Sequence, residues 1–177
     1  MEHSFLINDK ILLRALEPED IDLMYQIEND PQVWDISNFT VPYSRFVLKQ
    51  YIKESQCDIF VDKQLRLIVI RREDNVPIGT IDLSEFSPSH KRAEIGIVIN
   101  NQYRSMGYAS QAIKLLEDYA FKFLHIHSLT ALVSVQNDTS SKLFISCGYQ
   151  QTGVLKDWLY TEHGYEDIVV FQKLNKE

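Results

Sequence analysis

The stretch from Tyr103 to Ala109 has the residue types of an anion site made from main chain. It lies between a run that alternates like a strand and a run with helical periodicity, and it contains one glycine, Gly107. A turn there directs a row of backbone N–H groups and a helix N-terminus toward one spot, and the glycine lets a ligand approach the backbone. The stretch therefore predicts binding of a phosphate or a pyrophosphate.

Two common nucleotide motifs do not explain this loop. The sequence has no Gly-x-Gly-x-x-Gly, so the dinucleotide fingerprint is excluded, and no Gly-Lys-Ser/Thr follows the loop, so a Walker A motif is excluded too. A single glycine before a helix also occurs in purely structural turns. The loop alone therefore leaves the identity of the anion open.

The hydrophobic pattern predicts the elements that position the loop. From Arg92 to Ile99 isoleucines alternate with other residues, which indicates a strand with Glu94 on the face opposite the isoleucines. After Gly107 the period changes to about 3.6, and this indicates a long helix. Its hydrophobic stripe comprises Ala109, Ala112, Ile113, Leu116, Ala120 and Phe123. Six further strands are expected at Lys10–Leu16, Leu65–Arg71, Ile78–Phe86, Leu129–Val135, Tyr149–Leu155 and Tyr165–Leu174.

Three other helices complete the expected order. One begins at Glu17-Pro18 and runs to about Asn29, one spans Ser44 to Ser55, and a short one begins at Asn137 and ends at a glycine cap, Gly148. The order βαα-βββ-α-β-α-ββ implies an α/β (α+β) fold, in which a mixed sheet has helices on both faces. Because no repeat or linker-like stretch interrupts the chain, residues 1–177 are expected to form a single domain.

Composition excludes several classes of function. A net charge of −7 argues against nucleic acid as the main partner. No apolar run approaches the length of a membrane span and no secretory leader is present, so we expect a cytoplasmic protein without a membrane partner. Cys57 and Cys147 show no pairing pattern and the histidines show no zinc spacing, so no metal is expected. A homodimer is the default oligomer.

The charge is unevenly distributed along the chain. From Ala15 to Ser44 there are seven acidic residues and no lysine or arginine. One interpretation is a solvated helix face whose acidic first turn complements the helix dipole. The other is an electrostatic field that attracts a cationic substrate.

Taken together, these segments resemble the GNAT N-acetyltransferases. The resemblance rests on Arg92–Ile99, on the Arg-x-x-Gly-x-Ala of the loop, and on Asn137–Ser140 followed by Gly148-Tyr149. Asn29–Val33 looks like the branch of the RimJ/RimL ribosomal-protein N-terminal acetyltransferases and spermidine acetyltransferase. The resemblance covers nearly the whole chain, and it implies a GNAT-type, mostly antiparallel sheet of about seven strands and acetyl-CoA as the co-substrate.

The resemblance also implies a donor site. Backbone groups of Ile97, Val98 and Ile99 would pair with the pantetheine arm as with an added strand, and the amides of the loop would hold the pyrophosphate. Arg104 either adds a charge-assisted bond or is simply exposed. Asn137 matches a pantetheine-binding position, and capping of its helix is an equally natural role. The expected cofactor-binding residues are Ile97, Val98, Ile99, Arg104, Ser105, Met106, Gly107, Tyr108, Ala109, Asn137 and Phe144.

Catalysis by such an enzyme requires a neutral amine. A primary amine with a pKa of about 10.4 is mostly protonated at neutral pH, so a carboxylate that removes the proton promotes attack. Glu94 stands where the resembling enzymes often carry this base, and pairing with Arg92 is its structural alternative. For the leaving thiolate many of these enzymes use a tyrosine, but Phe144 stands here. Ser140, on the same helical face, matches a serine of the RimL-type branch, and helix capping is its alternative role.

The acceptor amine is the least determined part. It is expected to be a peptide or protein N-terminus or a small amine. A polyamine is favoured by the acidic segment, although Ile36–Val41 lacks the adjacent acids of the spermidine enzyme. Four aromatic residues either line an acceptor cleft or pack in the core: Trp34, Phe39, Trp158 and Tyr160. Phe144 in place of a tyrosine leaves a non-catalytic acyl-CoA-binding module as a different class of function.

Overall fold

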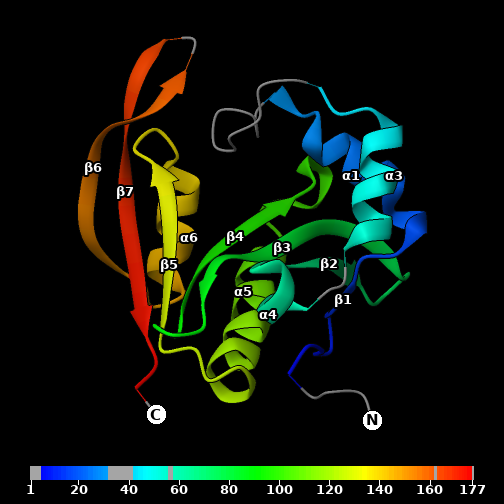
Figure 1. Ribbon diagram of the computed structural model, residues 1–177, viewed down its shortest axis with the longest axis horizontal. Coiled ribbons are helices and arrows are strands. Elements are labelled where there is room, and N and C mark those ends of the chain that lie inside the picture. Colours follow the sequence, from blue (N-terminus) through cyan, green and yellow to red (C-terminus); the bar gives the residue numbers. More distant parts are fainter. Residues whose placement is uncertain (1–4, 32–41, 56–57, 162, 177) are drawn as a thin grey trace.

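A seven-stranded sheet with the order β1-β2-β3-β4-β5-β7-β6 forms the centre of the molecule (Figure 1). The computed structural model describes residues 5–31, 42–55, 58–161 and 163–176. Its strands are Ile11–Ala15 (β1), Leu65–Arg71 (β2), Val76–Ser87 (β3), Arg92–Ile99 (β4), Ser128–Ser134 (β5), Gln150–Thr161 (β6) and Gly164–Leu174 (β7). Its α-helices are Ile21–Glu28 (α1), Arg45–Glu54 (α3), Ile59–Asp62 (α4), Tyr108–Asp118 (α5) and Asp138–Ser146 (α6). Shorter helical segments are Pro18–Asp20 (η1), Asn101–Tyr103 (η2) and the π-helix Tyr119–Phe123 (η3).

The sheet is mixed, as the order of elements predicts. β1 to β4 pair antiparallel in a meander, β4 and β5 pair parallel, and β7 pairs antiparallel with both β5 and β6. The parallel pair needs a long crossover connection, which α5 supplies. The expectation of a mostly antiparallel GNAT-type sheet of seven strands is therefore confirmed.

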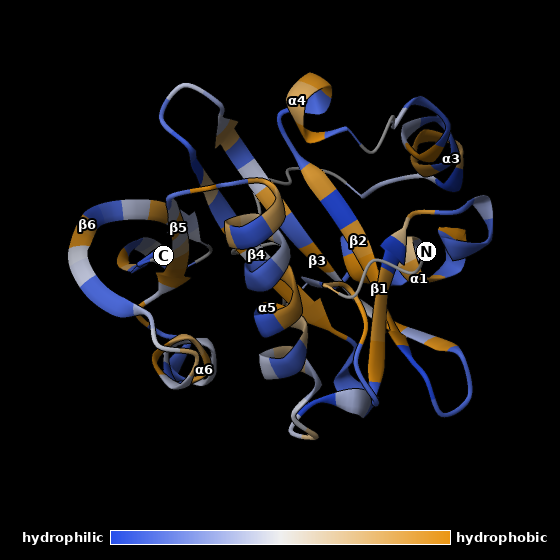
Figure 2. Ribbon diagram, turned by 90° about the horizontal axis from the view of Figure 1, so that it is seen from below, coloured by the Kyte–Doolittle hydropathy of each residue, from blue (hydrophilic) through white to orange (hydrophobic). Residues whose placement is uncertain are grey.

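Helices cover both faces of the sheet and enclose two hydrophobic cores. α5 and α6 lie on one face, where Ile113, Leu116 and Phe171 are at most 1% exposed. α1 and α3 lie on the other face of β1 to β4, where Met24 and Ile68 belong to a smaller core. Figure 2 shows α5 running along the sheet and α1 and α3 on the far side of β1. The predicted hydrophobic stripe thus packs α5 against the larger core.

The structure corrects three predictions of secondary structure. The long helix changes to the π-helix η3 after Asp118, which turns Phe123 away from the core to 48% exposure, where it stacks on Tyr119. β6 continues to Thr161 rather than ending at Leu155, because a bulge with Asp157 in the left-handed region (φ 49°) interrupts the alternation. The one-turn helix α4 was not predicted, since four residues leave no periodic signal.

Several predicted boundaries are confirmed. β2 and β4 have the expected bounds, and Glu17-Pro18 starts the first helical segment with proline inside its first turn. Gly148 has a φ of 86°, as expected for a glycine after a helix C-terminus. These features place the loop after β4 directly before the N-terminus of α5.

Candidate active site

β4 and β5 separate immediately after Glu94. The two strands pair only at Arg92–Ser128, Ala93–Leu129 and Glu94–Thr130, although both strands continue beyond these residues. On their outer sides β4 stays paired with β3 and β5 with β7. The ribbons of β4 and β5 accordingly diverge in Figure 1. The facing edges beyond the last pair therefore carry backbone groups that no neighbouring strand uses, as an added extended chain requires.

The predicted pantetheine-binding strand residues occupy this free edge. Ile97 and Val98 are half-buried and Ile99 is buried, so the edge lies between hydrophobic side chains. Ile97 contacts the α5/α6 core, and Val98 contacts the α1/α3 core. The edge is therefore held from both faces of the sheet while its backbone remains open toward β5.

The loop after β4 has the backbone geometry of an anion site. Ser105 and Gly107 both have positive φ, 61° and 79°, so two of three consecutive residues adopt the left-handed conformation. Gly107 is the N-cap of α5, and as a glycine it has no side chain to accept a hydrogen bond from the first turn of that helix. Free first-turn N–H groups and the positive end of the helix dipole together favour a bound anion.

The side chains of the loop hold its ends and leave its surface open. Arg104 donates from Nε to the Ile99 carbonyl at 2.9 Å, so part of its guanidinium fixes the loop to the end of β4. Ser105 and Met106 are exposed, and the side chain of Met106 is 55% exposed. Tyr108 and Ala109 are half-buried against the larger core. The six predicted loop residues thus connect the end of β4 to the first turn of α5.

Asn137 caps the N-terminus of α6. It follows the end of β5, and its Oδ1 accepts a hydrogen bond from the Ser140 backbone N–H at 3.0 Å. Its Nδ2 makes no hydrogen bond with a described residue, so the capping role leaves that end of the amide unused. Ser140 is half-buried, and the capping role considered for its side chain is wrong because the cap uses its backbone instead.

Phe144 fills a position in the larger core. It is 4% exposed, its ring meets that of Tyr149 edge-on with centroids 5.1 Å apart, and it stacks with Phe171. The side chain therefore offers little surface to a ligand and no proton for a leaving group. Tyr149 does not replace the missing tyrosine, because its hydroxyl is buried beside Glu117 and its pKa is raised by burial and by that carboxylate.

Glu94 stands at the point where β4 and β5 separate. Its neighbours Ala93 and Ile95 belong to the α5/α6 core, so Glu94 lies on the α1/α3 face. The carboxylate is half-buried and makes no hydrogen bond or ion pair with a described residue, Arg92 included. Burial raises its pKa, and the negative charge of Glu85 raises it further. A carboxylate with a raised pKa is a stronger base than an ordinary one.

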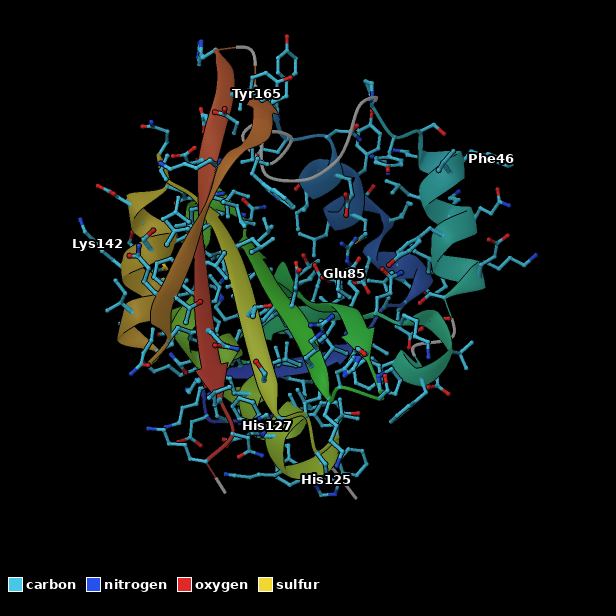
Figure 3. All side chains as sticks on the ribbon, turned by 60° about the vertical axis from the view of Figure 1, so that its left-hand side comes forward. Phe46, Glu85, His125, His127, Lys142 and Tyr165 are labelled. Carbon is cyan, nitrogen blue, oxygen red and sulfur yellow. The ribbon has the colours of Figure 1, made fainter. Side chains whose placement is uncertain are left out.

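Glu85 is a second carboxylate of this site that the sequence pattern does not reveal. It lies in a β-bulge of β3, one residue beyond the Ser84–Glu94 pair, and its φ is 49°. Figure 3 shows it on the side of the sheet where α1 and α3 lie. Its side chain is exposed and has no ion pair with a described residue. A glutamate in the left-handed region has no sequence signature comparable to that of glycine.

Several other charged side chains near this face form ion pairs. Arg66 bonds Glu28 at 2.5 Å and Asp82 at 2.7 Å, and burial raises the pKa of Glu28 although Arg66 lowers it in part. Two more acids of the Ala15–Ser44 segment pair with arginines outside it: Asp20 with Arg14, and Asp22 with Arg45. These three acids of the segment therefore serve the structure.

Open space adjoins Glu94 on the same face. A methyl group added at Gly96, two residues further along β4, would meet no atom within 4 Å. At Gly79 on β3 the same addition would lie 2.2 Å from the Val98 carbonyl, so that glycine is required for close strand packing. Gly96 instead leaves room between Glu94 and Val98.

The structure describes two of the four aromatic candidates for an acceptor cleft. Trp34 and Phe39 lie outside the described residues. Trp158 and Tyr160 are on β6, the edge strand of the sheet, and are 57% and 78% exposed, so core packing does not account for them. Tyr160 contacts the ring of Tyr165 on β7. A cleft that includes them remains a prediction.

Other kinds of site find no support in the described part of the chain. Its histidines, cysteines and acids form no group of three or more that could hold a metal ion. None of its helices combines the length and apolar character needed to cross a membrane. Cys147 lies at the end of α6, on the face opposite Glu94.

Comparison with known proteins agrees with this geometry. The family profile described as Acetyltransferase (GNAT) domain matches residues 10–150. A Bacillus licheniformis protein, uncharacterized N-acetyltransferase p20, is 30% identical over 97% of each chain. Spermidine N(1)-acetyltransferase of Escherichia coli K12 is 28% identical over 90% of this chain and 83% of its own. The Vibrio cholerae spermidine N-acetyltransferase structure with CoA and spermine superposes with a TM-score of 0.83 at 26% identity, covering 95% and 97% of the two chains.

Proposed function

Because the chain belongs to the GNAT acetyltransferase family, we propose that it transfers the acetyl group of acetyl-CoA to the primary amine of a small cationic acceptor. The observation that carries this proposal is the separation of β4 and β5 at Glu94, next to the amide-lined loop. A free strand edge, an amide-lined loop and a carboxylate without a described partner lie along β4 and its continuation, and this arrangement supports the proposal. Each of the three serves a different part of an acetyl transfer.

The donor fits the residues that are present. Acetyl-CoA joins an extended amide-containing arm to a pyrophosphate, which matches a strand edge that continues into a helix N-terminus. Ile97, Val98 and Ile99 would pair with the arm, and the backbone from Arg104 to Ala109 would hold the pyrophosphate. The unused Nδ2 of Asn137 would donate to the arm from the β5 side.

Glu94 would act as the general base. The acceptor arrives as an ammonium ion, and Glu94 takes one of its protons, directly or through water, which leaves a nucleophilic lone pair. The raised pKa of Glu94 lies closer to neutral pH than that of an ordinary glutamate. Proton transfer from an ammonium group to this carboxylate is therefore less unfavourable. General base catalysis of this kind contributes about 10²–10⁴-fold.

The transfer would take place in one step from donor to acceptor. The amine nitrogen attacks the thioester carbonyl, the C–N bond forms, the C–S bond breaks and the thiolate leaves. The nitrogen loses its second proton as the amide forms, and the thiolate takes up one proton. The Ser140 hydroxyl is the proposed relay, which gives its proton to the thiolate and regains one from the nitrogen, since Phe144 has no proton to give. A thiol with a pKa of about 8.5 is a tolerable leaving group, so this proton contributes less than the base.

A small cationic acceptor is favoured by the charges beside Glu94. Glu94 and Glu85 have no cationic partner among the described residues, whereas Glu28 and Asp82 share Arg66. Two unpaired carboxylates attract an acceptor that carries more than one positive charge. Gly96 leaves room for it, and spermidine acetyltransferases are among the relatives. A polyamine is therefore the leading acceptor.

Two alternatives follow from other residues. The likeness of Asn29–Val33 to the RimJ/RimL branch favours a peptide N-terminus as the acceptor. Phe144 in place of a tyrosine favours a module that binds acyl-CoA without turnover. Glu94 separates these alternatives, because a binding module needs no base at that position.

An acceptor panel tests the proposal. Wild-type protein and Glu94→Gln would be incubated with acetyl-CoA and with spermidine, spermine, a monoamine or an N-terminal peptide, and the products identified by mass spectrometry. We expect acetylated polyamine with the wild type and a large loss with Glu94→Gln. Acetylation of the peptide alone would replace the polyamine by the peptide N-terminus. Binding of acetyl-CoA without any product would establish the non-catalytic module.

A further inference from the structure

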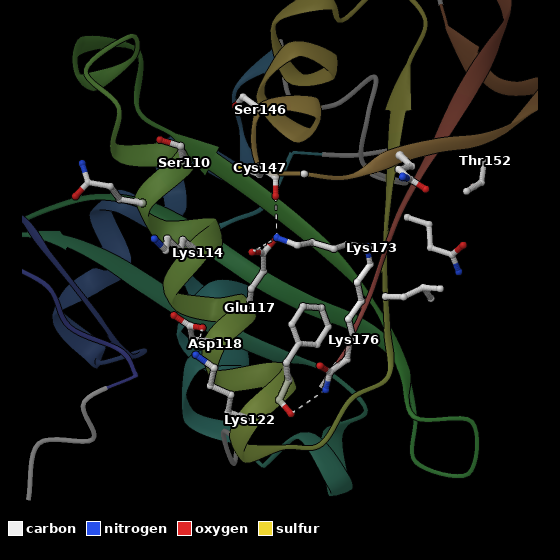
Figure 4. Close-up of a pocket in the computed structure, with 17 residues that line it drawn as sticks. Ser110, Lys114, Glu117, Asp118, Lys122, Ser146, Cys147, Thr152, Lys173 and Lys176 are labelled. Atoms are coloured by element: carbon white, nitrogen blue, oxygen red, sulfur yellow. Dashed lines mark hydrogen bonds and ion pairs between the residues drawn. The ribbon is translucent and has the colours of Figure 1, made fainter.

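A pocket of about 750 Å³ lies on the α5/α6 face, apart from the strand edge and Glu94. It is bounded by α5, the π-helix η3, the C-terminal end of α6, the start of β6 and the last residues of β7 (Figure 4). Ser146, Cys147 and Gly148 line it, whereas Asn137 and Ser140 are at the opposite end of α6. Its volume is in the range of sites for small molecules.

The charge of this pocket is opposite to that of the whole chain. Four lysines line it, Lys114, Lys122, Lys173 and Lys176, together with Glu117 and Asp118, while the chain has a net charge of −7. Lys122 pairs with Asp118 at 2.7 Å, and Lys173 pairs with Glu117 at 2.7 Å. Lys114 and Lys176 make no ion pair with a described residue. The pocket therefore has an excess of two positive charges.

Buried polar groups fix the inner wall of the pocket. Lys173 Nζ donates to Glu117 Oε2 and to the Cys147 carbonyl, both at 2.7 Å, and it lies 5.6 Å from the centre of the Tyr149 ring. Glu117 is 6% exposed, and its Oε1 and the Tyr149 hydroxyl are buried without a hydrogen-bond partner among the described residues. The Lys173 ammonium is thus held at the pocket between the C-terminal end of α6 and the Glu117 carboxylate. These contacts fix the wall of the pocket before a ligand binds.

From the cavity and its two uncompensated lysines we infer a second binding site, for a small anion that carries two or more phosphate or carboxylate groups. Lys114 and Lys176 would bind two of the anionic groups, and the side-chain amide of Gln150 would add a hydrogen bond. Acetyl transfer uses none of these residues.

Binding of an anion at this pocket must be distinguished from binding of CoA at the donor site. The pocket reaches Ser110 and Gln111, whose side chains donate to the Gly107 carbonyl at 3.0 and 3.3 Å. The end of the pocket at Ser110 is therefore one helical turn from the loop. Titrations would therefore be run with and without saturating CoA. Abolition of probe binding by CoA would make the pocket part of the donor site and would overturn the inference.

Isothermal titration calorimetry with two probes tests the site, with sodium tripolyphosphate for phosphate groups and citrate for carboxylates. We expect saturable one-to-one binding of one or both to the CoA-saturated protein, and a response to one alone would identify the anionic group. Lys114→Glu/Lys176→Glu would weaken binding by about tenfold or more, because both charge-assisted contacts become repulsive. Lys114→Gln/Lys176→Gln would weaken it less.

A matched control distinguishes a site from general attraction. Lys49→Glu/Lys53→Glu on α3 makes the same change in net charge at exposed positions far from the pocket along the chain. We expect that variant to bind both probes as the wild type does, and circular dichroism would verify the fold of each variant. Absence of saturable binding to the wild type, or equal weakening by both double variants, would contradict the inference.

Discussion

The two faces of the sheet are built in different ways. The α5/α6 face buries a large and continuous hydrophobic core, against which residues of β4 and of the loop after it pack. The α1/α3 face has a smaller core, and beyond it stand Glu28, Arg66, Asp82, Glu85 and Glu94. Under the proposed function, donor binding would depend on backbone held by packing, whereas acceptor binding and catalysis would depend on charged side chains. Substitutions on the two faces should therefore separate these functions.

The largest expected effect is on turnover. Glu94→Gln keeps the size of the side chain and removes the base, so kcat should fall by about 10²–10⁴-fold. The affinity for acetyl-CoA should stay unchanged, because the donor is held by backbone. Steady-state kinetics together with calorimetry would measure both quantities. A proportional loss of acetyl-CoA affinity would show that the two faces are not independent.

Removal of Arg66 should have the next largest effect, on stability. Arg66→Met removes the arginine that pairs with the buried Glu28 carboxylate and with Asp82, so the free energy of unfolding should fall by about 3–5 kcal/mol. Lys156→Met is a matched control at an exposed pair, since Lys156 is 77% exposed, and it should change stability little. Urea denaturation would compare the two variants. Equal stability of both would contradict a structural role for the paired charges.

The pH dependence of kcat/KM tests the repulsion between Glu85 and Glu94. The pKa of Glu94 is raised by burial and by the charge of Glu85, and the base is lost as pH falls through that pKa. Glu85→Gln removes the repulsion, so the pKa should fall and the acidic limb of kcat/KM should move to lower pH. Glu73→Gln, an exposed acid between β2 and β3, should leave the limb in place. A shift to higher pH in Glu85→Gln would contradict this assignment.

The smallest effects are expected at the start of α6. Asn137→Ala removes the side-chain cap and should lower stability by about 1 kcal/mol. Ser140→Ala keeps the backbone N–H that the cap uses, so stability should not change while kcat falls by less than about tenfold. Thermal unfolding and kinetics of the two variants would measure this difference. Loss of stability in Ser140→Ala would show that its hydroxyl has a structural role.

The elements that carry the proposed donor site were largely predictable because their signals are local. A glycine before a helix, a strand with alternating isoleucines and a hydrophobic stripe on α5 each extend over a few residues. The paired charges were not predictable, since Arg66 joins Glu28, 38 residues away, to Asp82, 16 residues away. Glu85 was missed because its bulge depends on how β3 and β4 pair.

The same reason explains what else the sequence did not reveal. The positive pocket combines α5, α6, β6 and β7, so its lysines gather only in the folded chain. The π-helix after α5 has no pattern that distinguishes it from continued α-helix, and Phe123 was consequently placed in the core. Periodicity describes each element, whereas these features depend on contacts between elements.

Calorimetric titration with acetyl-CoA tests the central claim, that the loop at the N-terminus of α5 binds the donor. We predict saturable one-to-one binding to the wild type, weakened at least about a hundredfold in Gly107→Glu, because a side chain at a φ of 79° strains the loop and its charge repels the pyrophosphate. Gly153→Glu on β6 makes the same substitution where an added Cβ meets nothing within 4 Å, and it should bind as the wild type does. Absence of binding to the wild type, or equal affinity of Gly107→Glu, would contradict the account.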